Sequence, residues 1–285
     1  MLNTPTTPTA YRGRIAPSPT GYLHLGHART FWTAQQRAKE QGGTLVLRME
    51  DLDAARCKPE FVDAIYEDLR WFGFSWEEGP DLSGAFALYT QSQRLPFYRA
   101  AFEQLKQHGL VYPCKCSRQD VMRALAAPHV GEEEPVYPGT CRESNSRAAD
   151  VKEKISWRFR VPDGEAIFFE DGGFGEQKFI AGKDFGDFVI WRHDDVPSYQ
   201  LSVVVDDAAM QMTEVVRGAD LLMSTARQIL LYRALELPAP AFYHCQLLND
   251  ENGVRLAKRN DCLSLRHLRE VGQSPERLKG DWDFY

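Results

Sequence analysis

Arg14-Ile-Ala-Pro-Ser-Pro-Thr-Gly-Tyr-Leu-His-Leu-Gly-His27 is the stretch of sequence that decides the fold. It connects residues 11–16, which we expect to form a strand, to residues 25–40, which we expect to form a helix. The prolines and glycine between them break regular structure. In an open α/β sheet, ligands bind where a strand ends and a helix begins, because the N–H groups and dipole of the helix attract phosphate. The sequence therefore predicts a phosphate-binding turn.

The segments that follow extend this turn into a larger unit. Residues 44–49 are predicted to form a buried strand, and residues 59–72 and 92–108 to form helices. Strand, loop, helix, strand and helix at this spacing are typical of a right-handed α/β unit with a parallel sheet.

The middle of the chain, residues 111–193, has a different character, because glycines and acids separate short segments typical of strands. We expect an inserted region here, with strands at 155–161, 166–170 and 188–192, rather than more of the parallel sheet.

The parallel sheet is expected to resume after this region. Residues 201–205, Leu-Ser-Val-Val-Val, are predicted to form a core strand, and Val215 and Val216 to end another. A helix is predicted over 225–235, with Ser224 as its N-cap.

The composition is typical of a soluble globular protein. The 285 residues, 43% hydrophobic and 26% charged, suffice for one large domain or two modest ones. No apolar run is long enough to span a membrane, and residues 1–10 lack the charge and apolar stretch of a secretory signal. We therefore expect a cytoplasmic protein with a loose N-terminus and no membrane partner.

The net charge of −6 counts against nucleic-acid binding, but it conceals a local basic segment. Residues 255–279 hold seven Lys or Arg residues against three acidic ones. This segment is a candidate surface for nucleic acid, whose binding should weaken steeply with salt; the alternative is a solvated helical face.

Two histidines in the predicted turn are candidate phosphate ligands. His24 and His27 could donate to the oxygens of a phosphate under attack, and Gly26 would let the backbone approach a nucleotide closely. His-x-Gly-His by itself also fits two surface histidines at a helix cap. The surrounding Pro-Ser-Pro-Thr-Gly favours the phosphate site.

A second constellation, Arg48-Met-Glu-Asp-Leu-Asp53, follows the second predicted strand. Carboxylates at the carboxyl end of a strand are available to a ligand cation. Glu50 is therefore a candidate acceptor for a cationic group of a ligand, such as an ammonium group, and the alternative is a loop of surface acids.

Three cysteines, Cys114, Cys116 and Cys141, are grouped in the sequence. A reducing compartment disfavours disulfides, so this group favours a metal site. Three thiolates and one further ligand make a closed tetrahedral zinc site, for which Tyr137 and His129 compete as the fourth ligand. The alternative is three buried thiols.

The stretch from Arg14 to His27 resembles the HIGH signature of class I aminoacyl-tRNA synthetases, and its Arg-x-Ala-Pro-Ser-Pro-Thr-Gly lead-in looks like the glutamyl branch. The glutaminyl branch carries Glu and Asn where this chain has Ser18 and Thr20. The resemblance covers nearly the whole chain after residue 10. It implies an α/β fold, a Rossmann-like parallel-sheet catalytic domain with an inserted zinc-bearing region.

The resemblance also assigns roles to the residues that match the family's motifs. It implies a glutamate site made of Arg14, Ile15, Ala16, Pro17, Ser18, Glu50, Tyr199 and Arg217. It implies an ATP site made of His24, Gly26, His27 and Lys258, of which the two histidines and the lysine are catalytic. The zinc sites of this branch match Cys-x-Cys and Tyr-x-x-x-Cys, so the resemblance favours Tyr137 as the fourth ligand of one structural Zn²⁺.

Arg14 and Arg217 are expected to flank the side-chain carboxylate of glutamate. Planar guanidinium groups bind carboxylates bidentately, and each charge-assisted hydrogen bond contributes about 1.5–3 kcal/mol. Glutamine could not satisfy two such groups. By itself, Arg217 also fits a structural ion pair.

Arg255-Leu-Ala-Lys-Arg259 partly resembles the KMSKS loop of the same family. Lys258 matches the second lysine, whereas Arg255 replaces the first lysine, and Ala257 and Arg259 replace the two serines. The resemblance implies that Lys258 neutralises the phosphates of ATP, to which Mg²⁺ binds. The pattern alone also fits a surface loop.

The chain ends 26 residues after Arg259, whereas complete glutamyl-tRNA synthetases continue into a helical anticodon-binding domain. In this it resembles the glutamyl-queuosine tRNA(Asp) synthetases, which load glutamate onto queuosine in the tRNA(Asp) anticodon. We expect a monomer whose catalytic domain receives the tRNA(Asp) anticodon stem-loop with splayed bases. The alternatives are a truncated glutamyl-tRNA synthetase that charges the tRNA(Glu) 3′ end, and a non-catalytic protein that binds glutamate or tRNA.

The expected domain organisation follows the same resemblance. It consists of a loose N-terminus (1–10), the first half of the nucleotide-binding domain (11–110), the inserted acceptor-like region (111–193), the second half of the catalytic domain (194–245), and the KMSKS-like loop with a C-terminal helical segment (246–285).

Overall fold

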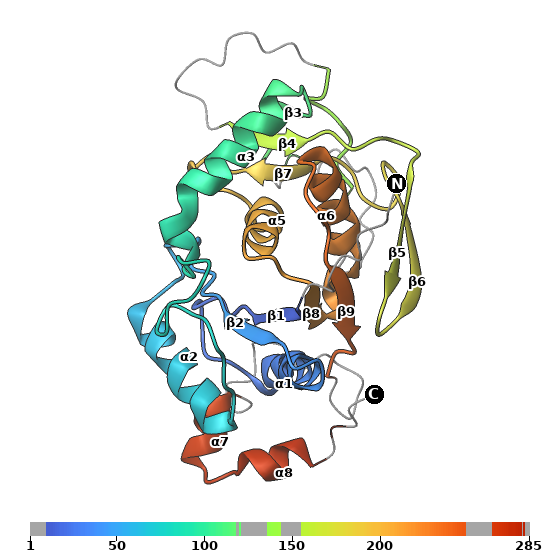
Figure 1. Cartoon of the computed structure of the whole chain (residues 1–285). Coiled ribbons are helices and arrows are strands. Elements are labelled where there is room, and N and C mark those ends of the chain that lie inside the picture. Colours follow the sequence, from blue (N-terminus) through green and yellow to red (C-terminus); the bar gives the residue numbers. More distant parts are fainter. Residues whose placement is uncertain are drawn as a thin grey trace, which may run out of the picture. The chain divides into compact units, whose positions relative to one another are not determined.

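Figure 1 presents a computed structural model of the chain, in which the described residues are 10–117, 120, 136–143, 155–248, 264–280 and 282. The chain divides into two compact units, and each contains segments that are distant in the sequence. The first consists of Met1–Gln93, Ala209–Leu221 and Pro240–Tyr285, and the second of Arg94–Ala208 and Leu222–Ala239.

Parallel strands form the centre of the first unit. They make two pairs, β1 (Arg12–Ile15) with β2 (Thr44–Leu47), and β8 (Glu214–Gly218) with β9 (Ala241–Cys245). The amide of Thr213, just before β8, donates to the carbonyl oxygen of Arg12 at 2.9 Å, so β1 lies beside β8. The predicted α/β fold with a parallel sheet is confirmed.

The first helix, α1 (Leu25–Glu40), lies along one face of these strands, as Figure 1 shows. Its bounds coincide with the predicted ones. Alternate residues of a strand face opposite sides, so Ile15, Leu47 and Val216 join the core that α1 covers. Val46 faces the other way and packs in a separate cluster with Tyr89 and two methionines.

The second helix, α2 (Pro59–Phe72), also has the predicted bounds. Pro59 suits the first turn because its fixed φ matches the helix and a first-turn N–H needs no partner in the helix. Gly73 ends the helix with φ of 90°, a left-handed conformation that glycine adopts without strain, and its N–H donates to the carbonyl oxygens of Leu69 and Arg70. The sequence therefore specifies both ends of α2 locally.

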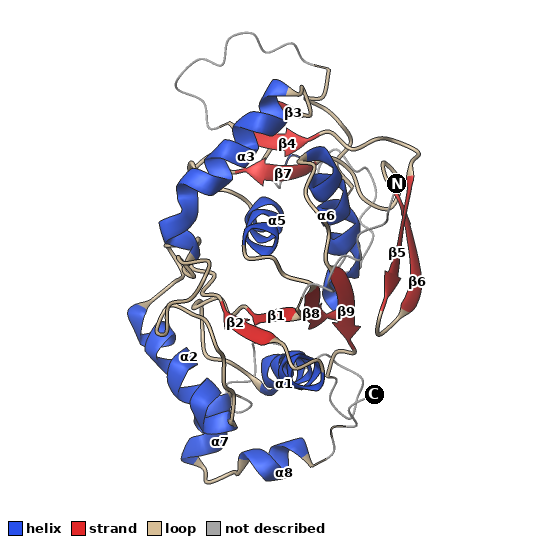
Figure 2. Ribbon diagram, viewed as in Figure 1, coloured by secondary structure: helices blue, strands red, loops and turns tan. Residues whose placement is uncertain are grey.

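Two short helices, α7 (Leu265–Glu270) and α8 (Pro275–Lys279), complete the first unit. Figure 2 shows α7 against α2. Ser264 and Ser274 cap these helices, and each side chain accepts a hydrogen bond from a backbone N–H three residues later.

The second unit contains an antiparallel sheet and a hairpin. The sheet has the order β3 (Val111–Cys114), β4 (Ser156–Phe159) and β7 (Phe188–Trp191), and the hairpin consists of β5 (Ala166–Asp171) and β6 (Gly175–Ile180). The strands predicted at 155–161, 166–170 and 188–192 are therefore confirmed.

The helix predicted over 92–108 is divided into two parts. A 3₁₀ turn, η1 (Gln91–Arg94), precedes α3 (Leu95–Gln107), and a proline in the first turn of α3 marks the point where the α-helix begins.

The strand predicted at residues 201–205 is wrong, because this segment lies within the helix α5 (Tyr199–Ala209). Every residue from Leu201 to Asp207 is buried, so burial does not distinguish one face of this helix from another. A short run of β-branched residues fits a buried strand or a buried helix equally well. Tertiary contacts decide the outcome: the side chains of Arg94 and Tyr98 donate to the two carboxylate oxygens of Asp206 at 2.6 and 2.8 Å.

The predicted N-cap at Ser224 is also wrong. The helix α6 (Leu222–Ala234) begins two residues before Ser224, directly after the 3₁₀ turn η2 (Ala219–Leu221). Ser224 is buried, and its hydroxyl accepts a hydrogen bond from the amide side chain of Gln200 at 3.1 Å. Ser224 therefore makes a long-range contact with Gln200 instead of capping the helix.

In the described part of the chain, no helix is both long enough and apolar enough to cross a membrane.

Asp68 is a buried carboxyl group where α2 meets α7. The guanidinium Nη1 of Arg269 lies 3.6 Å from Asp68 Oδ1, and no donor among the described residues makes a hydrogen bond to either carboxylate oxygen. Burial raises the pKa of Asp68 from 3.8 to about 6, although Arg269 opposes this change. The folded protein thus holds this proton more tightly than the unfolded chain, so stability falls as pH rises from 3.8 to about 6.

We expect Asp68→Asn to stabilise the protein relative to wild type at pH 7.5, because an amide can be buried without a charge. At pH 4.5 the wild-type carboxyl group is mostly protonated in the folded protein and no longer carries this cost. The advantage of the variant should therefore be about 2 kcal/mol smaller at pH 4.5 than at pH 7.5. Urea unfolding of both proteins at the two pH values measures it. The control is Glu60→Gln on the same helix, whose side chain is 59% exposed. A difference between Asp68→Asn and wild type that does not change with pH would contradict the prediction.

Candidate functional site

The turn after β1 is held against the segment that follows β2. The backbone N–H of Arg48 donates to the carbonyl oxygen of Ile15, and the N–H of Glu50 donates to that of Pro17, both at 3.0 Å. The pairing of β1 with β2 thus continues beyond the regular strands. It brings Glu50 beside the predicted turn, at the edge of the sheet where ligands are expected to bind.

Of the four predicted turn residues, Ile15 and Pro17 are buried, Ala16 is half-buried and Ser18 is exposed. The carboxylate of Glu50 is itself nearly buried and accepts from the guanidinium of Arg48, with Nη2 at 3.0 Å and Nε at 3.3 Å from Oε1. This ion pair holds the carboxylate in one orientation beside the turn.

His24 and His27 form a reciprocal cap at the start of α1. His24 is the N-cap, and its Nδ1 accepts from the backbone N–H of Gly26 at 3.1 Å, while Nδ1 of His27 accepts from the backbone N–H of His24 at 3.2 Å. The two ring centroids lie 3.7 Å apart. A nitrogen that accepts carries no proton, so both rings are neutral. In this geometry the N–H of each ring is therefore on Nε2.

Gly26 has a steric role in this cap. A Cβ atom at this position would lie 2.9 Å from Cε1 and 3.0 Å from Nδ1 of His24, closer than ordinary contact allows. Any larger residue would therefore displace the imidazole. From the sequence alone, Gly26 was predicted only to let the backbone approach a nucleotide closely.

Arg14 and Arg217 lie on one face of the parallel sheet. Their neighbours Ile15 and Val216 both point into the core covered by α1, so the two arginines point to the opposite face. Nη1 of Arg14 donates to the carbonyl oxygen of Val216 at 2.9 Å, and both arginine side chains are buried. The structure therefore brings these two predicted residues together.

His244, which the sequence analysis missed, lies beside Arg217. The two residues are paired in the β8–β9 ladder, and Nε of Arg217 donates to Nε2 of His244 at 3.1 Å. In the sequence, the only sign of this contact is a polar residue inside the apolar run Phe-Tyr-His-Cys. Such a residue does not indicate which side chain it contacts.

The chain returns to the histidine cap at the start of α7. The backbone N–H of Leu265 donates to the carbonyl oxygen of Leu23 at 2.7 Å, and Ser264 forms an antiparallel bridge with His24. Lys258, six residues before Ser264 in the sequence, lies outside the described residues, as does His129. Tyr199 is the first residue of α5 in the second unit and is 39% exposed.

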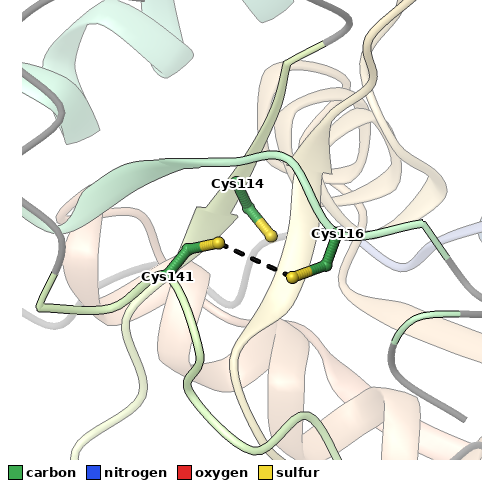
Figure 3. A group of neighbouring side chains, drawn as sticks. All are labelled: Cys114, Cys116 and Cys141. Atoms are coloured by element: carbon green, nitrogen blue, oxygen red, sulfur yellow. Dashed lines mark hydrogen bonds between the residues drawn. The ribbon is translucent and has the colours of Figure 1, made fainter. Parts of the chain in front are cut away.

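The three predicted cysteine ligands converge in the second unit. Cys114 ends β3, and Figure 3 shows its sulfur turned toward those of Cys116 and Cys141. The three sulfur atoms lie within 4.8 Å of one another, and the Cys116 and Cys141 sulfurs are 3.6 Å apart. That separation is far longer than the roughly 2.05 Å of a disulfide bond. The thiols are free, and the group could hold a metal ion.

The hydroxyl of Tyr137 occupies the fourth position of this cluster. Its oxygen lies 3.4 Å from the sulfur of Cys114 and 3.6 Å from that of Cys116, and it accepts from the backbone N–H of Cys141 at 2.9 Å. A tetrahedral zinc site requires about 3.8 Å between sulfurs and about 3.5 Å between sulfur and oxygen. The Cys116–Cys141 separation and both sulfur–oxygen separations are close to these values, and the remaining sulfur pairs lie within 4.8 Å.

Arg158 supplies a positive charge to the cluster and was missed by the sequence analysis. Its Nε donates to the sulfur of Cys114 at 3.2 Å, and its guanidinium carbon lies 3.8 Å from the ring centroid of Tyr137. A guanidinium group in this position stabilises negative charge on the sulfur.

The thiols differ in acidity. Burial raises the pKa of Cys116 to about 11. Burial also raises the pKa of Cys141, but hydrogen bonds from the backbone N–H of Lys115 and the side chain of Tyr137 outweigh it and lower this pKa to about 7. Cys141 is therefore the thiol that ionises more readily of these two.

Comparison with known families confirms the resemblance predicted from the motifs. The family model described as "tRNA synthetases class I (E and Q), catalytic domain" matches residues 10–279. A protein named Glutamyl-Q tRNA(Asp) synthetase from Symbiobacterium thermophilum is 50% identical, with 94% of this chain and 84% of the relative covered. One of the same name from Nitratidesulfovibrio vulgaris is 46% identical, with the same coverage.

A solved structure gives the same result for the fold. The glutamate tRNA ligase from Elizabethkingia meningosepticum, crystallised in complex with its amino acid, matches with a TM-score of 0.77 and 30% sequence identity. The match covers 93% of this chain but 53% of the ligase, so the chain spans about half the length of that structure.

We expect the purified protein to carry about one equivalent of a thiolate-binding metal ion, and Cys116→Ser to lose most of it, because a closed site needs all its ligands. Metal analysis after dialysis against a weak chelator measures this. Cys57→Ser is the matched control, since Cys57 is a half-buried cysteine outside the cluster. Full metal content in Cys116→Ser would remove Cys116 from the ligand set.

Proposed function

This chain belongs to the catalytic-domain family of the class I tRNA synthetases for glutamate and glutamine, and from this premise we propose that it activates L-glutamate with ATP and transfers it to queuosine in the anticodon of tRNA(Asp). The observation that carries the choice of acceptor is the high identity, over almost the whole chain, to relatives named Glutamyl-Q tRNA(Asp) synthetase. The chain covers most of the length of those relatives, which supports a comparison of whole activities.

The proposed reaction has two steps. An oxygen of the glutamate α-carboxylate attacks the α-phosphate of ATP, a new P–O bond forms, and pyrophosphate leaves to give glutamyl-adenylate. The acceptor group on queuosine then attacks the activated carbonyl, and AMP leaves with the bonding electron pair. Both steps depend on positioning and on neutralisation of phosphate charge.

Arg14 and Arg217 are proposed to bind the side-chain carboxylate of glutamate. Their position on one face of the sheet, joined through the Val216 carbonyl, supports this role. Glu50 is proposed to accept the α-ammonium group, and the backbone of the turn to contact the substrate. A neutral glutamine amide would leave a buried guanidinium poorly satisfied, so glutamate is preferred.

The histidine cap is proposed to bind the phosphates of ATP. The Nε2 donors of His24 and His27 suit phosphate oxygens, and the helix N-terminus adds its dipole. Lys258 and Mg²⁺ are proposed to neutralise the remaining charge. Ser264 lies beside His24, and Lys258 precedes Ser264 by six residues in the sequence, which supports the assignment for Lys258.

A structural Zn²⁺ ion is proposed at Cys114, Cys116, Cys141 and Tyr137. The agreement of the sulfur and oxygen spacings with tetrahedral geometry supports this assignment. Cys114 at the end of β3, with Cys116, Cys141 and Tyr137, would hold the ion, which would then stabilise the second unit.

Part of the basic segment 255–279 is engaged within the chain. Arg266 pairs with Glu270, Arg269 pairs with Glu67, and the ammonium group of Lys279 lies 3.7 Å from the ring centroid of Trp32. We propose this segment as the tRNA surface, because exposed ion pairs such as Arg266–Glu270 are weak and can exchange for phosphate contacts.

The proposed function is tested by ATP–pyrophosphate exchange and by transfer of labelled glutamate. Exchange should require glutamate and proceed without tRNA, because activation precedes transfer. Label should then appear on tRNA(Asp) that contains queuosine and not on tRNA(Asp) that lacks it. Transfer to the 3′ end of tRNA(Glu) would instead support a glutamyl-tRNA synthetase, and absence of exchange with and without tRNA would reject an enzyme.

Gly26→Ala should lower kcat for exchange by about 10²-fold, because the added methyl group displaces the His24 ring from its donor position. Gly21→Ala is the matched control, since a Cβ atom at Gly21 in the same turn meets nothing within 4 Å. The measurement is the initial rate of exchange at saturating ATP and glutamate. Equal rates for the two variants would show that the ring position of His24 does not matter.

A further inference from the structure

The contact between Arg217 and His244 joins two side chains that are almost fully buried. Arg217 is 4% exposed and His244 is 1% exposed. Because the two residues are paired in the parallel ladder of β8 and β9, their side chains point to the same face of the sheet. This is also the face on which Arg14 lies.

The chemistry of the two groups determines which one donates. A guanidinium group always carries a proton on Nε, so Nε2 of His244 is the acceptor in the 3.1 Å contact. The imidazole is therefore neutral, with its proton on Nδ1. A carboxylate in this position would cancel the positive charge of Arg217, whereas a neutral imidazole orients the guanidinium and leaves its charge in place for an anion.

A second contact holds the same guanidinium group. The ring centroid of Phe242 lies 5.5 Å from the guanidinium carbon of Arg217. Phe242 and His244 are two residues apart on β9 and so share one face of the sheet. The hydrogen bond commits the Nε side of the guanidinium group, and bidentate carboxylate recognition then uses the edge formed by Nη1 and Nη2.

We propose that His244 is a positioning residue for substrate selection, which holds Arg217 in the orientation that receives the side-chain carboxylate of glutamate. This inference rests on the proposed function and deepens it. It assigns His244 a role through Arg217 and not through contact with the substrate. His244 thereby contributes to the preference for glutamate over glutamine, since a misaligned guanidinium group loses the bidentate geometry that distinguishes them.

Two polar substitutions separate this role from a general effect on folding. His244→Gln places an amide oxygen near the position of Nε2 and keeps an acceptor for Arg217. His244→Asn has an amide that reaches only as far as Nδ1 and so cannot accept from Nε of Arg217. Both variants keep a polar side chain of moderate size on β9, so a difference between them reports on the acceptor.

Steady-state exchange kinetics with the full chain measure the effect. We expect His244→Asn to raise the KM for glutamate about tenfold to a hundredfold, which is the range for one lost hydrogen bond to a charged group. The KM for ATP should stay unchanged, and His244→Gln should stay within a few-fold of wild type. The ratio of kcat/KM for glutamate over glutamine should fall in His244→Asn and recover in His244→Gln.

Cys245→Ala is the matched control for packing. Cys245 is the next residue on β9, is similarly buried, and points into the core on the other face of the sheet. We expect this variant to lower the melting temperature without changing the KM for glutamate.

The inference is overturned if His244→Asn keeps the wild-type KM for glutamate, or if the KM values for glutamate and ATP rise together. It is also overturned if His244→Gln behaves like His244→Asn. Failure of the proposed function would look different, because the wild-type protein itself would then show no exchange that depends on glutamate.

Discussion

The alternation of side chains along β1 and β8 is the constraint on which the candidate site depends. Ile15 and Val216 must face the core under α1, so Arg14 and Arg217 must face the other side. A shift of one residue in either strand would exchange these positions and bury a guanidinium group among apolar residues. The apolar core therefore determines where the positive charges of the site lie.

An ion pair between Glu214 and Arg37 holds the amino end of β8. The carboxylate of Glu214, at the start of β8, accepts from the hydroxyl of Tyr11 and from two nitrogens of Arg37, each at 2.7 Å. Arg37 lies near the end of α1, and its guanidinium carbon is 4.2 Å from the ring centroid of Tyr243 on β9. These contacts tie α1 to the amino ends of the strands, which leaves the carboxyl ends for the histidine cap and the turn.

In the second unit, hydrogen bonds of Asp187 and Arg158 hold the segments around the cysteine cluster. Asp187 links several segments, because its carboxylate accepts from the hydroxyl of Tyr112 at 2.5 Å and from the backbone N–H of Val161 at 2.8 Å. Its carbonyl oxygen accepts from Arg158, the residue that also donates to Cys114. The sulfur atoms thus lie within a hydrogen-bonded framework that positions them before any ion binds. Such surroundings are what hold metal ligands in their orientation.

The sequence by itself determined the features that depend on neighbouring residues. The proline at the start of α2 and the glycine after it, the turn between β1 and α1, and the short spacing of Cys114 and Cys116 are all local signals. Tertiary structure decided the rest. The sequence does not reveal that residues 201–205 are helical, because burial on all sides hides the periodicity that separates a strand from a helix. The contacts of His244 with Arg217 and of Arg158 with Cys114 join residues 27 and 44 positions apart, and only the folded chain brings such groups within hydrogen-bonding distance.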